Sequence, residues 1–300
     1  MISLTNPSRR SRIATIPYPD NKIGEMEAAM FVYGDDSSDE KRERVTAIGI
    51  VLGSGGMWSA FEPKWIARNG GVPFHAKDCE SDQGDYRDTP HADNKALYRD
   101  LVTMLAESGL GGLGVAIDLT VQREIFPNAL DFMYYKAFVE MLPYVSRFAA
   151  SKDRIAKFTF DISTENEYNA ALLYSYFREN EPEMSKHFAS EISFGYAKDS
   201  ARLQVADLMA FEAMKALDNI IGPVKRKRRG SWAALQSTSR FETLAFSRDW
   251  FVDYKNHYAD LEKLVGFNVK DYERWLTEKK RHDDVSNRFH FITWMAKLKT

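Results

Sequence analysis

The chain has 300 residues, enough for one large domain or for a core domain with an addition. Hydrophobic residues make up 44% and charged residues 28%, a balance that indicates a folded globular protein and argues against wholesale disorder. The formal net charge of -2 excludes a general attraction to phosphate or to acidic membranes. A nucleic-acid site would therefore need a local cluster of basic residues.

The lone cysteine, Cys79, cannot form an internal disulfide, and the six histidines show no zinc-binding spacing. Residues 1–26 are polar and lack the apolar stretch of a signal peptide, so we interpret them as a leader arm. No later run approaches the roughly 18 continuous apolar residues of a membrane span. These observations predict a cytoplasmic protein without a membrane partner.

Hydrophobic periodicity predicts strands that alternate with helices. Structure is expected to begin near Met30 with two antiparallel strands joined by an acidic, turn-forming segment. Such a strand pair followed by strand and helix alternation predicts an α/β fold with a mixed sheet flanked by helices. The expected elements are strands over 30–34, 45–53, 113–119, 157–162 and 188–196, and helices over 92–109, 129–150, 164–181 (with Thr164 and Glu167 as a capping box) and 201–219.

The basic run KRKRR, flanked by glycine and proline, predicts a domain boundary. We expect a core domain over 27–221 and a mainly helical extension over 222–300. The aromatic residues of this extension are spaced for helical packing, in a core or in a homodimer contact.

Several aspartates fall where a metal-dependent phosphoryl-transfer site would need them. Asp35 or Asp36, Asp118 and Asp161 each end a predicted strand, and Asp207 lies inside a predicted helix. Hard cations such as Mg²⁺ or Mn²⁺ prefer oxygen ligands, and short aspartate side chains at strand ends can converge on one point. The plainer interpretation of Asp118 and Asp161 is a loop carboxylate or a helix cap.

Asp207 is the most informative of these aspartates. On a helical wheel it lies at the edge of the apolar arc formed by Leu203, Phe211 and Met214. A carboxylate there is costly unless it is paired or bound to a metal. The alternative is a buried salt bridge, for example with Arg202.

Three further patterns in the sequence have a functional and a plainer interpretation. In FHAKD, His75 and Asp78 form a short polar cluster at the end of what looks like a strand, and alone this cluster would be a turn with a surface histidine. Cys79 has no base at a defined spacing and is not expected to be a nucleophile. GLGGLG (109–114) lies between a helix and a strand, the reverse of the order in a dinucleotide-binding motif. The basic run could bind phosphates, and the tryptophan after it could stack on a base. The plainer interpretation of the run is a solvated loop. The candidate nucleic-acid-binding residues are Lys225, Arg226, Lys227, Arg228, Arg229 and Trp232.

Three segments together resemble the family known as domain of unknown function 3800, which is itself similar to ribonuclease H and retroviral-type integrases. They are VYGDDSSDE (32–40), FHAKD (74–78) and KDSARLQVADLMA (198–210), in the same order and spacing over about residues 28–220. Within the last segment, Asp199, Ser200, Gln204, Ala206 and Asp207 fall in register. The chain departs from the family in having Asp36 for glutamate and Ser38 for glycine.

The resemblance implies a ribonuclease-H-like fold with Asp35 on the first strand, Asp207 on the last core helix, and His75 and Asp78 beside them. Asp118 and Asp161 are both left as candidates to complete a metal site. We therefore expect an Mg²⁺- or Mn²⁺-dependent nuclease in which His75 assists proton transfer. The alternatives are a non-catalytic module that binds nucleic acid or protein in a mobile-element or defence system, and a small-molecule phosphoesterase.

Overall fold

The fold is built on a six-stranded mixed sheet with the strand order β5-β4-β1-β2-β3-β6. The computed structural model describes residues 29–126, 132–162, 167–180 and 182–265. β2 runs antiparallel to both of its neighbours, and the other pairings are parallel. The strands are β1 (Ala29–Ser38), β2 (Val45–Ser54), β3 (Gly111–Asp118), β4 (Ile155–Asp161), β5 (Ser193–Gly195) and β6 (Phe241–Phe246).

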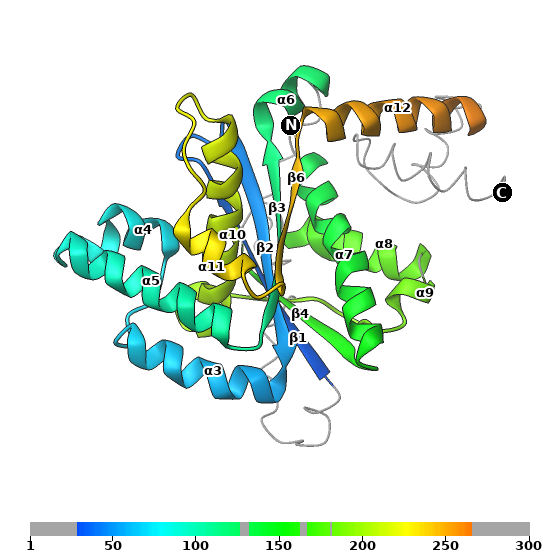
Figure 1. Ribbon diagram of the computed structural model, residues 1–300. Helices are drawn as coiled ribbons and strands as arrows, with labels where there is room; N and C mark the ends of the chain where they lie inside the picture. The colour runs from blue at the N-terminus through cyan, green and yellow to red at the C-terminus, as the bar shows by residue number, and fades with distance from the viewer. Residues whose placement is uncertain (1–28, 127–131, 163–166, 181, 266–300) are drawn as a thin grey trace, which may run out of the picture.

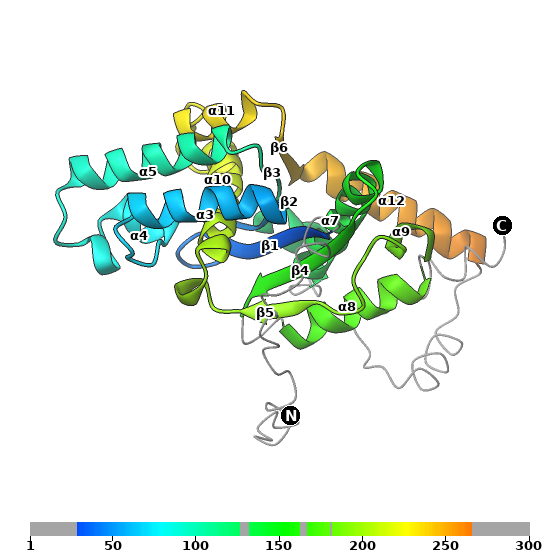
Figure 2. The same ribbon diagram turned by 90° about the horizontal axis from the view of Figure 1, so that it is seen from below.

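Helices cover both faces of this sheet, so the molecule has three layers (Figure 1). The first face carries α3 (Gly55–Arg68), α4 (Ala76–Ser81), α5 (His91–Glu107), α10 (Ala201–Ile221) and α11 (Gly230–Gln236). The second face carries α6 (Leu119–Ile125), α7 (Phe132–Ser151), α8 (Glu167–Asn180), α9 (Pro182–Ser185) and α12 (Arg248–Val265). Short 3-10 turns are η1 (Gly84–Tyr86) and η2 (Ala197–Asp199). Figure 2 gives the view from below, with α3, α4 and α5 on one side of the strands and α8 and α9 on the other.

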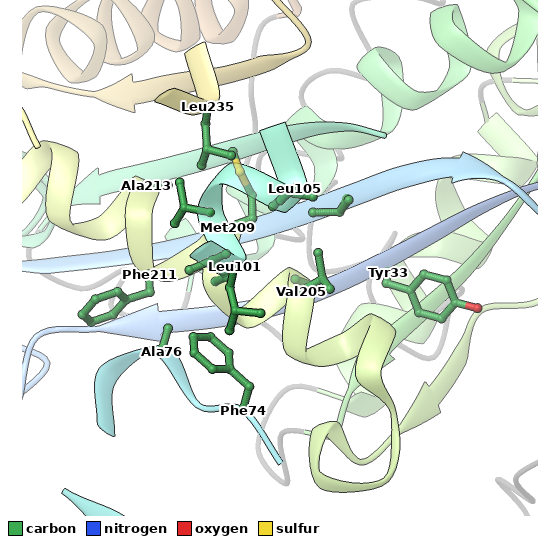
Figure 3. Close-up of a cluster of buried hydrophobic side chains, with 14 of the residues drawn as sticks. Tyr33, Phe74, Ala76, Leu101, Leu105, Val205, Met209, Phe211, Ala213 and Leu235 are labelled. Carbon is green, nitrogen blue, oxygen red and sulfur yellow. The ribbon is translucent and has the colours of Figure 1, made fainter. Parts of the chain in front are cut away.

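α10 lies directly on the sheet and is itself covered by other helices. A Cβ atom on Gly49 of β2 would lie 2.2 Å from the main-chain nitrogen of Ala210, and one on Gly114 of β3 would lie 2.3 Å from the Cβ of Ala213. These glycines therefore permit the close approach of α10. Figure 3 shows Leu101 and Leu105 of α5 and Leu235 of α11 packed around Met209 and Ala213 of α10. A helix apolar on most of its surface is buried in this way.

The α/β fold with a mixed sheet and flanking helices is as the sequence predicts, but several boundaries differ. β1 continues to Ser38 because Asp35 and Asp36 pair with Gly49 and Ile48 of β2. The expected strand over 188–196 shrinks to the three residues of β5. FHAKD does not end a strand: His75 is the N-cap residue of α4. The expected capping box begins at Thr164, outside the described residues.

The expected helical extension after residue 221 also needs correction. β6 pairs in parallel with β3 and belongs to the central sheet, and α11 packs against α5. Residues 230–246 are thus part of the core domain, although they follow the basic run. Over the residues that the structure describes, no helix has both the length and the apolar character that a membrane span requires.

Candidate active site

Three aspartates from three elements lie near one another beside the end of β4 and the later half of β1. Gly34 of β1 pairs with Phe160 of β4, and Asp35 and Asp161 are the next residues on these parallel neighbours. Asp35 also pairs with Gly49, whose Cβ position faces α10. Because directly paired residues point to the same face of a sheet, Asp35 lies on the α10 side. Asp207 of α10 completes the group, which we call the acidic cluster: Asp35, Asp161 and Asp207.

Asp207 is almost fully buried, with 4% of its surface exposed. Its Oδ2 accepts a hydrogen bond of 2.6 Å from the main-chain nitrogen of Ala76, and its Oδ1 lies 4.0 Å from Nε2 of His75. Burial raises the pKa of Asp207 to about 6, against the lowering effect of His75 and of the Ala76 amide. The negative charge of Asp161 contributes to the rise. A carboxylate that titrates near neutral pH is typical of functional sites.

Asp35 and Asp161 are shifted in the same direction. Burial raises the pKa of Asp35 most, and the charges of Asp207 and Asp161 raise it further. Burial also raises the pKa of Asp161, whose Oδ1 accepts a hydrogen bond of 2.6 Å from the main-chain nitrogen of Ala197. The three carboxylates thus share one partly buried region, in which the negative charge of Asp161 raises the pKa of both Asp35 and Asp207.

His75 and Asp78 lie at the edge of the acidic cluster. Nδ1 of His75 is 3.0 Å from Oδ2 of Asp78, and the two side chains are 54% and 32% exposed. The imidazole therefore spans from a solvent-accessible carboxylate to the buried Asp207. Cys79 follows in α4 but is buried, and burial raises the pKa of its thiol to about 12, which disfavours the reactive thiolate.

The structure separates the two candidates that the sequence left open. Asp161 lies beside Asp35, whereas Asp118 lies at the end of β3 and caps α6, its Oδ1 accepting hydrogen bonds from the amides of Thr120 and Val121. β2 lies between β3 and β1 in the sheet. Asp35 pairs with Gly49 of β2, which pairs with Gly114 of β3, and Asp118 comes four residues after Gly114. Asp118 is thus a helix cap away from the cluster.

Asp36 also points away from the acidic cluster. It pairs with Ile48, a residue of the core on the second face, so alternation along β1 directs the two adjacent aspartates to opposite sides of the sheet. Its main-chain nitrogen donates a hydrogen bond of 2.7 Å to Oδ1 of Asp35. Asp36 therefore contributes an amide to the site, together with a charge that raises the pKa of Asp35.

The basic segment is divided between exposed and structural residues. Lys225, Arg226, Lys227 and Arg228 are exposed. Arg229 is instead held by Glu212 and Glu80, and Trp232 is 5% exposed. The interpretation of Trp232 as a base-stacking residue is therefore wrong, because its ring packs in the core. Arg229 is committed to an internal ion pair, so the candidate phosphate-binding residues reduce to the first four.

Sequence reasoning missed the main-chain groups that hold the acidic cluster. The amides of Ala76 and Ala197 each bind one carboxylate, and both come from short segments that meet the cluster only in the folded chain. No side-chain pattern identifies such donors. It also missed Glu212, a fully buried glutamate one helix turn beyond Leu208, whose partners lie far away in sequence.

No family model, curated protein or solved structure matches this chain. Among the residues that the structure describes, no three His, Cys, Asp or Glu side chains have their ligand atoms gathered around a single metal position. The candidate site therefore rests on the geometry and electrostatics of its own residues.

Proposed function

We propose that this protein is a divalent-metal-dependent nuclease, with Asp35, Asp161 and Asp207 as the groups that hold Mg²⁺ or Mn²⁺. The observation that carries the proposal is that carboxylates from β1, β4 and α10 lie in one place. Within this group, the charges of Asp207 and Asp161 raise the pKa of Asp35, in addition to the effect of burial. His75 lies beside them and lowers the pKa of both Asp161 and Asp207, against the effect of burial. Asp207 is buried and the other two are partly buried, and carboxylates removed from water in this way are costly unless an ion neutralises them.

The donor set is suited to a hard divalent cation. All three candidate ligands are carboxylates, and a main-chain amide holds one oxygen of each. An ionised carboxylate keeps further lone pairs for a ligand. When bound, such an ion would lower the pKa of a water that attacks phosphorus and would stabilise the leaving oxygen.

His75 is the residue that we assign to proton transfer. Its contact with Asp78 orients the ring, and Nε2 then faces Asp207. Because the side chain is 54% exposed, it can exchange protons with solvent while it reaches the buried cluster. Asp78 acts through His75 as a positioning residue.

We further propose that the fold is ribonuclease-H-like. This is supported by an antiparallel run of β1, β2 and β3, with β4 and β5 added in parallel beside β1. The segments that resemble the domain of unknown function 3800 family fall on β1, on α4 and its N-cap, and on η2 and α10. Each of them contributes a residue at or next to the acidic cluster.

The test compares the wild type with Asp207→Asn. We expect Mg²⁺ or Mn²⁺, but not EDTA, to raise the melting temperature of the wild type, because an ion bound only by the folded state stabilises it. The variant should lose this rise, together with cleavage of labelled single- and double-stranded DNA and RNA. Normal cleavage by Asp207→Asn would overturn the assignment. Nucleic-acid binding that needs no metal and is accompanied by no cleavage would favour the non-catalytic module.

A further inference from the structure

The turn that follows β5 places an exposed aromatic ring beside the acidic cluster. Tyr196 is 54% exposed, and among the aromatic side chains whose exposure the structure describes it is the only exposed one. The amide that binds Asp161 belongs to Ala197, the next residue. Adding the C–N and Cα–C bond lengths to the 2.6 Å hydrogen bond puts the α-carbon of Tyr196 within about 5.5 Å of Oδ1 of Asp161.

The main chain of this turn is fixed from both sides. The N–H of Ala197 is held by Asp161, and its carbonyl oxygen accepts a hydrogen bond of 3.0 Å from Nε2 of Gln204. Gln204 is 5% exposed and is itself held, because its Oε1 accepts a hydrogen bond of 3.3 Å from Nε1 of Trp65. The exposed ring is therefore attached to a main chain that Asp161 and Gln204 hold in place. Binding of a ligand to the ring would require little ordering of the turn.

A cation accompanies the ring. Nζ of Lys198 lies 5.3 Å from the centroid of the Tyr196 ring, within the range of a cation–π contact. Lys198 is exposed and supplies positive charge next to a cluster that by itself would repel a phosphate. An aromatic face with an adjacent cation is the combination that single-stranded nucleic acids bind, because every base has a face for stacking and every linkage has a charge.

We propose that Tyr196 and Lys198 bind an unpaired nucleotide next to the scissile linkage, the ring stacking on the base and the ammonium group contacting a phosphate. Stacking needs a free base face, which a base inside a duplex does not offer. The inference rests on the proposed function in that it places a nucleic acid at the acidic cluster, and it names single-stranded or unpaired nucleic acid as the substrate class.

The test measures binding by the full chain, without cleavage. Fluorescence anisotropy would follow a fluorescein-labelled oligothymidylate of about 12 nucleotides and a blunt hairpin duplex, in buffers containing EDTA or Ca²⁺. We expect the wild type to bind the oligothymidylate more tightly than the hairpin. Tyr196→Ala should weaken oligothymidylate binding by about fivefold to about a hundredfold, and Tyr196→Phe should bind like the wild type. Lys198→Ala should reduce the slope of log K against log salt by about 0.7.

Two matched controls remove similar side chains elsewhere. Leu244→Ala deletes an exposed apolar group on β6, at the opposite edge of the sheet, and Lys152→Ala deletes an exposed lysine before the start of β4. Both should bind like the wild type. The inference is overturned if the wild type binds the oligothymidylate in neither buffer, if Tyr196→Ala binds it within about twofold of the wild type, or if Tyr196→Phe loses as much affinity as Tyr196→Ala.

The inference and the proposed function can fail separately. Metal-dependent melting and cleavage depend on Asp207, whereas oligothymidylate binding in EDTA depends on Tyr196. Loss of binding in Tyr196→Ala without any metal response in the wild type would uphold the nucleotide site and reject the nuclease. A metal response in the wild type, with oligothymidylate binding unchanged in Tyr196→Ala, would support the nuclease and reject the nucleotide site.

Discussion

The carboxylate of Asp207 accepts a hydrogen bond of 2.6 Å from the main-chain nitrogen of Ala76, which joins the core helix α10 to the start of α4. His75 precedes Ala76, so the same contact sets the imidazole beside the acidic cluster. One buried aspartate therefore both positions the proposed proton carrier and belongs to the proposed metal site. Its charge makes this arrangement sensitive to pH.

Without metal, the charge of Asp207 should destabilise the fold as pH rises. The pKa of Asp207 is about 6 in the folded protein and 3.8 in its ordinary state, so the folded state binds the extra proton between these values. Stability therefore falls as pH rises through this window, and above it the full cost of about 2 to 3 kcal/mol is present. Asn cannot titrate but can still accept from the Ala76 amide. In EDTA, the stability of Asp207→Asn relative to the wild type should rise from about pH 4 to about pH 7.

Urea unfolding at several pH values would measure this difference. Asp82→Asn is a useful contrast, because hydrogen bonding to Asn94 lowers the pKa of Asp82 and the sign of the effect reverses. A difference between Asp207→Asn and the wild type that does not change with pH would contradict the burial of an ionisable group at this position.

Gly49→Ala should destabilise the protein strongly. The added Cβ would lie 2.2 Å from the main-chain nitrogen of Ala210, and neither β2 nor α10 can move without disturbing the core. Such overpacking costs about 1 to 3 kcal/mol or more. Gly56→Ala in α3 is the matched control, because its Cβ would meet no atom closer than 4.0 Å and alanine favours a helix. Chemical denaturation should show a lower midpoint for the first variant and an unchanged or higher one for the second.

Arg229→Ala should leave a buried charge without its counter-ion. Glu212 is fully buried, and its Oε1 accepts hydrogen bonds of 2.9 Å from Arg229 and 2.6 Å from the hydroxyl of Tyr98. Removing the arginine should cost about 3 to 5 kcal/mol. The double variant Glu212→Gln with Arg229→Ala should recover part of the loss, since glutamine can still accept from Tyr98 without a charge.

Arg226→Ala serves as the control for that pair, because Arg226 is exposed in the same segment. Its unfolding midpoint should match that of the wild type. If the Arg229→Ala and Arg226→Ala proteins unfolded at the same denaturant concentration, the ion pair with Glu212 would have no structural importance. Urea midpoints decide between these outcomes, and they do so without any assay of nucleic-acid binding.

Five of the six strands and the helices α5, α7, α8 and α10 could be predicted because their periodicity is local, whereas β6, α3 and α11 were not predicted. Strand runs such as VTAIGIVLG and the apolar face of α10 contain the information for their own elements. The choice between Asp161 and Asp118 could not be predicted from the sequence, because β4 and β3 run in the same direction and both aspartates end their strands on the same side of the sheet. Only the strand order shows that β4, and not β3, lies beside β1. The role of Trp232 was also beyond the sequence, since burial depends on α5 and α10 packing around it.

The exposed basic residues should contribute charge to nucleic-acid binding without being essential for catalysis. Lys225, Arg226, Lys227 and Arg228 follow α10, whose Asp218 lies eleven residues after Asp207, or about 16 Å along the helix axis. Phosphates bound there would therefore lie well away from the scissile linkage. Short substrates would not reach both places, whereas longer ones would.

Replacing these four residues with glutamine tests this separation. The variant should bind long single strands more weakly, with a salt slope reduced by about 0.7 for each phosphate contact that is lost. Cleavage of oligonucleotides of only a few residues should continue at the wild-type rate, because Asp35, Asp161 and Asp207 are untouched. Equal loss of cleavage on short and long substrates would place the basic segment at the reacting linkage itself. Loss of all binding, in a protein that never cleaves, would favour a non-catalytic module that holds nucleic acid through charge alone.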